Sequence, residues 1–133
     1  MIAPDTSVLI AGFDPAHESH DAAQSRLVAV RGEERLLAHT IAETVAVLTA
    51  PGPYGIEHEA VLRYLDQFLD RRPVAPVDVR ATIGRATTAG VVGGAIYDAL
   101  IGLTALEHGA TLVSLDRRAA ATYRRCGVDF ELL

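Results

Sequence analysis

Strand-like and helix-like segments alternate along the whole chain. Short apolar segments of the kind that form buried strands occur at 1–4, 35–38, 74–77, 110–115 and 128–132. Segments with helical periodicity or helix-capping residues lie between them, at 6–13, 15–31, 40–50, 56–72, 78–89, 95–108 and 117–126. This alternation is typical of a parallel sheet that carries helices on both faces. We therefore expect an α/β fold with three layers, α/β/α, around a central parallel sheet of four or five short strands.

Residues that typically begin or end helices support the predicted helix boundaries. Asp78 suits an N-cap position, and Gly109 suits the position just after the helix at 95–108. Pro73 would end the helix that precedes it. With 133 residues, the chain suits one domain, 1–133, with one hydrophobic core.

Composition removes several classes of protein. No apolar run reaches the roughly 18 residues that a membrane helix needs, and the N-terminal MIAPDTSVLI lacks the basic region of a signal peptide. Cys126 is the single cysteine, which excludes a disulfide within the chain. We expect a cytoplasmic protein without a membrane segment. The formal net charge of −5 disfavours nonspecific binding to nucleic acid, but less so if several acids surround cations in one cleft.

Four acidic residues stand in segments that are otherwise apolar. Asp5 and Asp116 each directly follow a predicted strand. In a parallel sheet both would emerge at the carboxyl edge, where ligands bind in such folds. Glu43 is the single charge of its predicted helix, and Asp98 is the single charge within 95–106.

Each of these acids also has a local structural interpretation. Asp5 and Asp116 could be N-caps of the helices that follow them. Thr40 and Glu43 match a capping box, in which the glutamate reaches back to the start of its helix. Asp98 could be an acid in a first helical turn, favoured by the helix dipole. Taken singly, each acid leaves both interpretations open.

Taken together, the four acids indicate a metal site. A carboxylate buried alone is costly, so buried acids are protonated, paired or bound to metal. The sequence around Asp5, Glu43 and Asp98 offers no neighbouring basic residue. Carboxylate oxygens suit Mg²⁺ or Mn²⁺, and such ions activate water and neutralise phosphate. The pattern predicts a divalent metal and hydrolytic chemistry.

Three stretches carry a resemblance to a known family: DTSVLIA at the start, TIAETVAVL in the first half, and YDALIGLTALEHGATLVSLD near the end. The chain resembles PIN-domain proteins and, more narrowly, the VapC ribonuclease toxins of bacterial toxin–antitoxin pairs. The resemblance covers essentially the whole chain and implies a single PIN-like domain. Its most specific part is the aspartate-bearing helix that leads into a strand ending in Ser-x-Asp.

The resemblance implies a function and a catalytic site. By it, Asp5, Glu43, Asp98 and Asp116 are the catalytic acids that bind the metal, Mg²⁺ or Mn²⁺. It implies an endoribonuclease that cleaves RNA, often transfer RNA or other structured RNA, with a metal-activated water. It further implies neutralisation by a cognate VapB-like antitoxin and assembly as a homodimer.

Further residues are candidates to support the acids. Ser7 and Ser114 match the small hydroxyl positions of the family, and Thr40 lies just before Glu43's turn of helix. Arg117 and Arg118 follow Asp116 and are candidates to contact phosphate, for which arginine geometry is well suited.

The chain departs from the family pattern at two positions. Ala119 stands where many relatives carry another acid or amide, which weakens the expectation of a second metal. Pro4 precedes Asp5 where a β-branched residue is usual, and it removes one backbone donor from the end of the strand.

Two other classes of protein stay open at this point. A receiver-like regulator, which accepts phosphate on an aspartate, also uses strand-end acids, but it normally carries paired acids and a lysine. Here all 12 basic residues are arginine. A noncatalytic binding module with the PIN fold is the other alternative. Metal-dependent turnover that is lost in Asp98→Asn would eliminate it.

Overall fold

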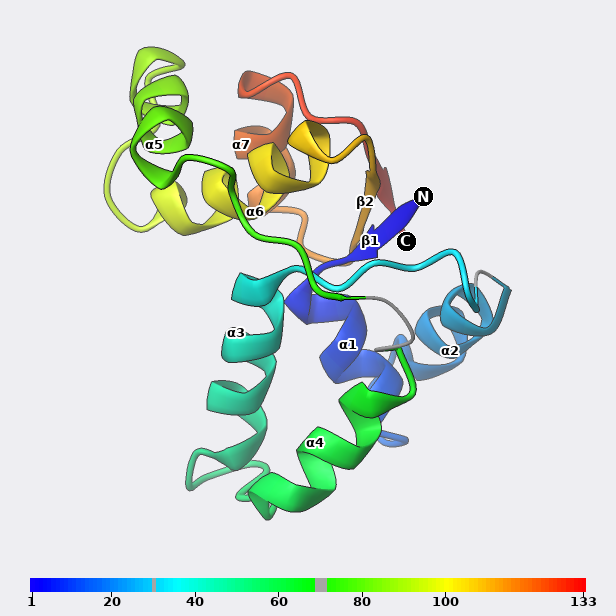
Figure 1. The fold of residues 1–133 in the computed structure, drawn as a ribbon. Helices are drawn as coiled ribbons and strands as arrows, with labels where there is room; N and C mark the ends of the chain where they lie inside the picture. The colour runs from blue at the N-terminus through cyan, green and yellow to red at the C-terminus, as the bar shows by residue number, and fades with distance from the viewer. Residues whose placement is uncertain (30, 69–71) are drawn as a thin grey trace.

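The structure is a computed structural model that describes residues 1–29, 31–68 and 72–133. Within them, a parallel sheet of three strands runs in the order β1 (Ile2–Pro4), β2 (Thr111–Ser114) and β3 (Phe130–Leu132). Ala3 lies opposite Leu112, which lies opposite Phe130 on its other side. The sheet thus joins the two ends of the chain, with the N-terminal strand beside two strands from the C-terminal part (Figure 1).

Helices cover both faces of this sheet, which confirms the predicted α/β/α arrangement. They are α1 (Thr6–Phe13), α2 (His20–Ala29), α3 (Ala38–Thr49), α4 (His58–Asp66), α5 (Val79–Thr88), α6 (Ala95–Glu107) and α7 (Ala119–Arg125). Successive side chains of a strand point to opposite faces. Accordingly, Val113 of β2 packs in the apolar core with α1, α2, α3 and α4, whereas Leu112 packs in the core with α6 and α7 (Figure 1).

The number of strands differs from the prediction of four or five. The segments 35–38 and 74–77 do not form strands of the sheet. In their place there are two isolated parallel bridges, one between Ile2 and Glu34, just before the first segment, and one between Leu37 and Val74. Both bridges lie on the β1 side, so they continue the sheet beyond its edge without forming a ladder.

Local chemistry explains why these two segments stop at bridges. Helix α3 begins at Ala38, directly after the bridging residue Leu37, so the extended segment ends there. Val74 stands between Pro73 and Ala75-Pro76, and neither proline has an N–H to donate to a neighbouring strand. The available amides are used once each: Val74 N–H donates to Leu36 O at 3.0 Å, and Ala38 N–H donates to Val74 O at 2.8 Å.

Several helix limits match the prediction and others are shifted. Helix α6 lies within one residue of 95–108, with Gly109 in the left-handed region (φ 66°) where its turn requires glycine. Asp78 caps α5 by accepting from Ala81 N–H at 3.1 Å, as predicted. The helix predicted at 15–31 begins instead at His20.

The late start of α2 has a cause in the preceding loop. The Asp14 carboxylate accepts the Ala16 N–H at 2.9 Å, which closes a turn where the helix was expected to begin. The helix predicted at 56–72 is shorter, since α4 begins at His58 and ends at Asp66. The predicted end of that helix falls partly on 69–71, outside the described residues.

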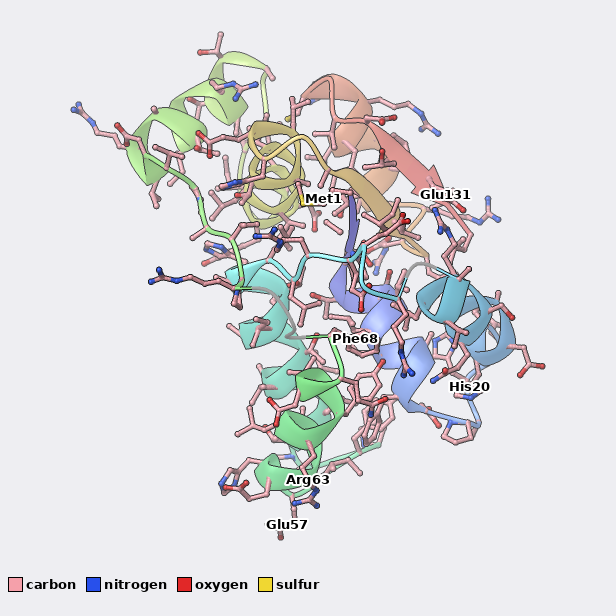
Figure 2. All side chains as sticks on the ribbon, turned by 45° about the vertical axis from the view of Figure 1, so that its right-hand side comes forward. Met1, His20, Glu57, Arg63, Phe68 and Glu131 are labelled. Atoms are coloured by element: carbon pink, nitrogen blue, oxygen red, sulfur yellow. The ribbon has the colours of Figure 1, made fainter. Side chains whose placement is uncertain are left out.

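An ion pair joins α2 to the sheet. Arg26 Nη2 lies 2.7 Å from Glu131 Oε2, and Arg26 Nε also donates to both carboxylate oxygens. Figure 2 shows Glu131 on β3 beside α2. Of the helices described, none is both long and apolar enough to cross a membrane.

Candidate active site

A pocket of about 380 Å³ lies at the carboxyl ends of β1 and β2, between α3 and the pair α6 and α7. Asp5, Glu43, Asp98 and Asp116, the acids singled out in the sequence, all line it. The sheet topology explains why these acids lie together. Strands β1 and β2 are parallel neighbours, so the residues that follow them, Asp5 and Asp116, lie at the same carboxyl edge of the sheet. Helices α3 and α6 then add one acid each. Small or apolar residues form another part of the wall: Ala46, Val47, Ile101 and Ala119.

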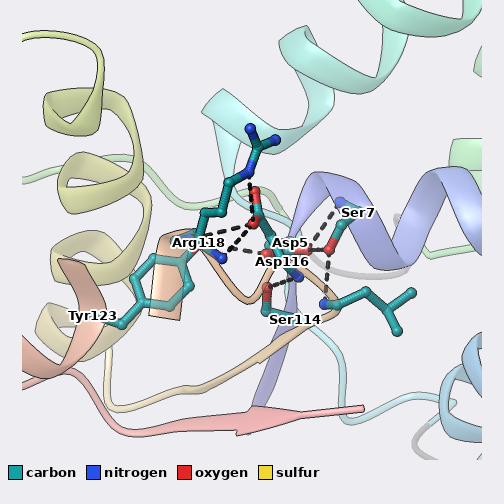
Figure 3. A network of polar contacts seen from close by, with 8 residues as sticks. Asp5, Ser7, Ser114, Asp116, Arg118 and Tyr123 are labelled. Atoms are coloured by element: carbon teal, nitrogen blue, oxygen red, sulfur yellow. Dashed lines mark hydrogen bonds and ion pairs between the residues drawn. The ribbon is translucent and has the colours of Figure 1, made fainter. Parts of the chain in front are cut away.

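Asp5 is the most buried of the four acids, with 4% of its surface exposed. It is the N-cap of α1, and its Oδ1 accepts the N–H groups of Ser7 at 2.9 Å and Val8 at 3.3 Å. The Ser7 hydroxyl also donates to Oδ1, as Figure 3 shows. Burial raises the pKa of Asp5, and hydrogen bonds from Ser114 and Ser7 oppose that rise.

The two predicted supporting serines lie beside Asp5. While Ser7 donates its hydroxyl to Asp5, its oxygen accepts the Leu115 N–H at 2.8 Å, which ties the start of α1 to the segment after β2. Ser114 is fully buried, and its hydroxyl accepts the Asp116 N–H at 3.0 Å. The Ser7 hydroxyl therefore links the Asp5 side chain to the segment after β2, and the Ser114 hydroxyl holds the backbone of Asp116 (Figure 3).

Glu43 is held by a residue of another helix. Its Oε2 accepts the Thr6 hydroxyl at 2.6 Å, which joins α3 to α1 across the pocket. The capping-box alternative for Thr40 and Glu43 is wrong, because α3 begins at Ala38 and both residues lie inside the helix. Thr40 is fully buried and donates its hydroxyl to Leu37 O at 2.9 Å, so its side chain supports the helix backbone.

Asp116 both lines the pocket and begins the turn into α7. Its Oδ1 accepts the N–H of Arg118 at 2.8 Å and of Ala119 at 3.2 Å. Arg118 Nε lies 3.9 Å from the same oxygen, on a side chain that is 97% exposed. Arg118 therefore lies beside Asp116 with an exposed side chain, and neither Arg118 nor the exposed Arg117 lines the pocket itself.

The pKa of Asp98 reflects its burial and the charges around the pocket. It lies in the first turn of α6 and is half-buried. Its pKa is raised to about 6, first by burial and then by the negative charges of Asp116, Glu43 and Asp5, while Arg118 lowers it. The four carboxylates are thus close enough to repel one another.

Sequence reasoning missed two polar residues of the pocket, Thr6 and Tyr123. Tyr123 of α7 is 1% exposed, and its hydroxyl donates to Asp5 Oδ2 at 3.3 Å. Burial raises the pKa of its phenol, and the charges of Asp5 and Asp98 raise it further, so the hydroxyl keeps its proton. Thr6 stands directly after Asp5 and so could have been suspected. Tyr123 has no such signal, because its contact spans the whole chain.

The donor chemistry fits a divalent cation, although the carboxylates do not form a closed cluster. Among the residues that the structure describes, no three of the His, Cys, Asp or Glu side chains converge as ready-made ligands. Protein donors hold three of the acids instead: Asp5, Glu43 and Asp116. Burial and then the charges of the other three acids raise the pKa of Asp98, and a cation between these groups would relieve the repulsion among them.

Comparison with known proteins extends these observations. The family described as PIN domain matches residues 2–125. Ribonuclease VapC40 of Mycobacterium tuberculosis (strain ATCC 25618 / H37Rv) is 43% identical over 136 residues, covering 100% of this chain and 99% of that protein. Ribonuclease VapC27 of the same strain is 34% identical over 134 residues, covering 96% of this chain and 93% of that protein.

Solved structures share the fold. The structure of FitAB bound to an IR36 DNA fragment superposes with a TM-score of 0.72 at 25% identity, covering 99% of this chain and 94% of that chain. VapBC2 from Rickettsia felis, bound to a DNA fragment from its promoter, gives a TM-score of 0.66 at 19% identity and covers 100% of this chain and 99% of that one.

Proposed function

This chain belongs to the PIN-domain family, and from that premise we propose that it is a VapC-type toxin, a metal-dependent endoribonuclease. The observation that carries the proposal is the gathering of four carboxylates in one pocket, where burial and then the negative charges of its neighbours raise the pKa of Asp98 to about 6. The 43% identity to a protein named ribonuclease VapC40 supports the reaction class.

We assign the metal-holding role to Asp5, Asp98 and Asp116, with Glu43 beside them. Mg²⁺ or Mn²⁺, when bound, makes water a stronger nucleophile and stabilises negative charge on the scissile phosphate. One oxygen of Asp5 and one of Asp116 accept helix N–H groups, so the Oδ2 of each is the oxygen we assign to the cation.

Glu43 has a separate role in the proposed reaction. Its Oε2 is fixed by the Thr6 hydroxyl at 2.6 Å, so we assign Oε1 to the attacking water. A carboxylate at hydrogen-bond distance of that water can orient it and accept its proton. The exposed Arg118 beside Asp116 is the group we assign to a phosphate of the RNA chain.

The proposed substrate is RNA, with transfer RNA and other structured RNA as the molecules to test first. The proposed protein partners are a VapB-like antitoxin and a second copy of the chain. The relationship to VapC proteins and the fold shared with VapBC2 from R. felis support the antitoxin. Light scattering of the purified chain tests the homodimer.

The function is tested by incubating the purified chain with total RNA and with transfer RNA, in Mn²⁺, in Mg²⁺ and in EDTA. We expect discrete cuts that EDTA abolishes and Mn²⁺ restores, and no cutting by Asp5→Asn. Cutting that persists in EDTA, or that survives in Asp5→Asn, would contradict the proposal.

A further inference from the structure

A tyrosine hydroxyl touches the acid at the centre of the proposed metal site. Tyr123 of α7 donates its hydroxyl to Asp5 Oδ2 at 3.3 Å, and it lines the pocket beside Asp98 and Asp116. The separation in sequence is 118 residues, so this contact exists because the fold brings α7 against the end of β1.

The two oxygens of Asp5 have different partners. Oδ1 accepts from Ser7 N–H, Ser7 hydroxyl and Val8 N–H, all of them at the start of α1. Oδ2 accepts from Tyr123. Helix α1 therefore fixes Oδ1, Ser114 also hydrogen-bonds the carboxylate, and the Tyr123 hydroxyl is the donor to Oδ2 that α7 supplies.

The ring of Tyr123 is itself held in place from several sides. A Cβ on Gly102 of α6 would lie 3.0 Å from Tyr123 Cδ1 and 2.9 Å from Val128 Cγ2, so α6 approaches this ring at van der Waals contact. The ring of Phe130 packs against it with centroids 5.5 Å apart. A ring confined in this way presents its hydroxyl in one direction.

From these contacts we infer that Tyr123 is a positioning residue for the metal site. Its hydroxyl orients Asp5 so that Oδ2 faces the pocket, in the arrangement that a divalent cation needs. The inference rests on the proposed function. Partners of this kind, which hold a ligand without touching the metal, typically change metal affinity by about 10–100-fold when removed.

The chain offers a matched control in Tyr64. Tyr64 is 8% exposed, and its hydroxyl donates to the backbone oxygen of Leu9 at 2.8 Å, away from the acids. Removal of either hydroxyl leaves the ring in place and deletes one buried hydrogen bond. Since the Tyr64 bond is the shorter, Tyr64→Phe is expected to cost at least as much stability as Tyr123→Phe.

The test measures Mn²⁺ affinity by calorimetry, without RNA, for the wild type, Tyr123→Phe, Tyr64→Phe and Asp5→Asn, with thermal melts of each. We expect Mn²⁺ binding to weaken about 10-fold or more in Tyr123→Phe and to stay within about 2-fold of the wild type in Tyr64→Phe. Wild-type affinity in folded Tyr123→Phe overturns the inference and leaves the proposed function standing. If the wild type binds no Mn²⁺, both the proposed metal-dependent function and this inference are contradicted.

A second measurement needs no variant of Tyr123. In wild-type protein labelled with ¹³C at the tyrosine Cζ, Mg²⁺ is expected to shift the Tyr123 resonance. A cation bound to Asp5 Oδ2 withdraws electron density from that oxygen, which accepts the hydrogen bond of the Tyr123 hydroxyl. The Tyr64 resonance is expected to stay in place. Saturation with Mg²⁺ that leaves Tyr123 unmoved overturns the inference even if Tyr123→Phe does not fold.

Discussion

Asp5 and Asp116 show that an aspartate that accepts hydrogen bonds from helix N–H groups can also line the pocket. In each, Oδ1 accepts the N–H groups at the start of the next helix, while the carboxylate lines the pocket. The sequence poses capping and metal binding as alternatives, but each carboxylate has two oxygens. The helix N–H groups hold Oδ1 of each aspartate, and the Oδ2 of Asp5 accepts the Tyr123 hydroxyl.

Asp98 gives a prediction about stability and pH. Its pKa in the folded protein, about 6, lies above the usual 3.8, so folding takes up a proton between these values. Stability is therefore highest below that window and falls as the pH rises through it. We expect Asp98→Asn to stabilise the metal-free protein by about 1 kcal/mol above pH ~6, after allowance for solvent screening of a half-exposed group.

Urea unfolding of the metal-free wild type and Asp98→Asn, at about pH 4 and about pH 7.5, measures this effect. The stabilisation should appear at the higher pH and vanish at the lower one. Asp21→Asn, an exposed acid on α2, is the control for loss of one charge. Equal effects of Asp98→Asn at both pH values would show that the pKa of Asp98 is not raised in the folded protein.

At the scale of elements, α6 illustrates how a glycine inside a helix sets the distance to its neighbour. Gly102 lies one turn after Asp98 and lets α6 approach Tyr123 and Val128 closely. Alanine is the better helix former by about 1 kcal/mol. Its methyl group, however, would meet both side chains at about 3 Å.

We expect Gly102→Ala to destabilise the protein by about 1–3 kcal/mol, because the overpacking outweighs the gain in helix propensity. The matched control is Gly84→Ala on α5, where an added Cβ meets no atom within 4 Å. That variant is expected to gain up to about 1 kcal/mol. Chemical denaturation of both variants measures these changes in stability. A stabilised Gly102→Ala would mean that α6 and α7 pack less closely than the structure shows.

The elements also show what the sequence could predict. Strong local signals placed α6 and the Asp78 cap within about a residue. The segments 35–38 and 74–77 were misassigned because apolar character favours extended structure without saying where hydrogen-bond partners lie. The capping-box interpretation of Thr40 and Glu43 was wrong because the helix begins before Thr40, at Ala38.

At the scale of the whole molecule, the site exists because distant segments meet at one sheet edge. Asp5 and Asp116 could be placed at that edge from the alternation of strands and helices. Thr6 and Glu43, which are in contact, are 37 residues apart in the sequence, and Tyr123 and Asp5 are 118 residues apart. Only the three-dimensional packing of α1, α3 and α7 determines such contacts, so no local pattern predicts them.

Cation binding at this edge should stabilise the folded chain as a whole. The unfolded chain cannot gather the four carboxylates, so a ligand of the folded state raises the melting temperature. At a Mn²⁺ concentration of about 100 times its dissociation constant, the gain is about 2.7 kcal/mol. Thermal scans with and without Mn²⁺ measure it. An unchanged melting temperature at millimolar Mn²⁺, or an equal rise in Asp5→Asn, would count against the site.

The most direct test of the central claim, that this acidic pocket cleaves RNA, is the single-turnover rate of RNA cleavage by Asp98→Asn in Mn²⁺. Asp21→Asn, far from the pocket, is the control. We expect Asp98→Asn to lose about 100-fold or more in rate while staying folded, and Asp21→Asn to cleave as the wild type does. Wild-type cleavage by folded Asp98→Asn would contradict the claim and place the catalytic site elsewhere.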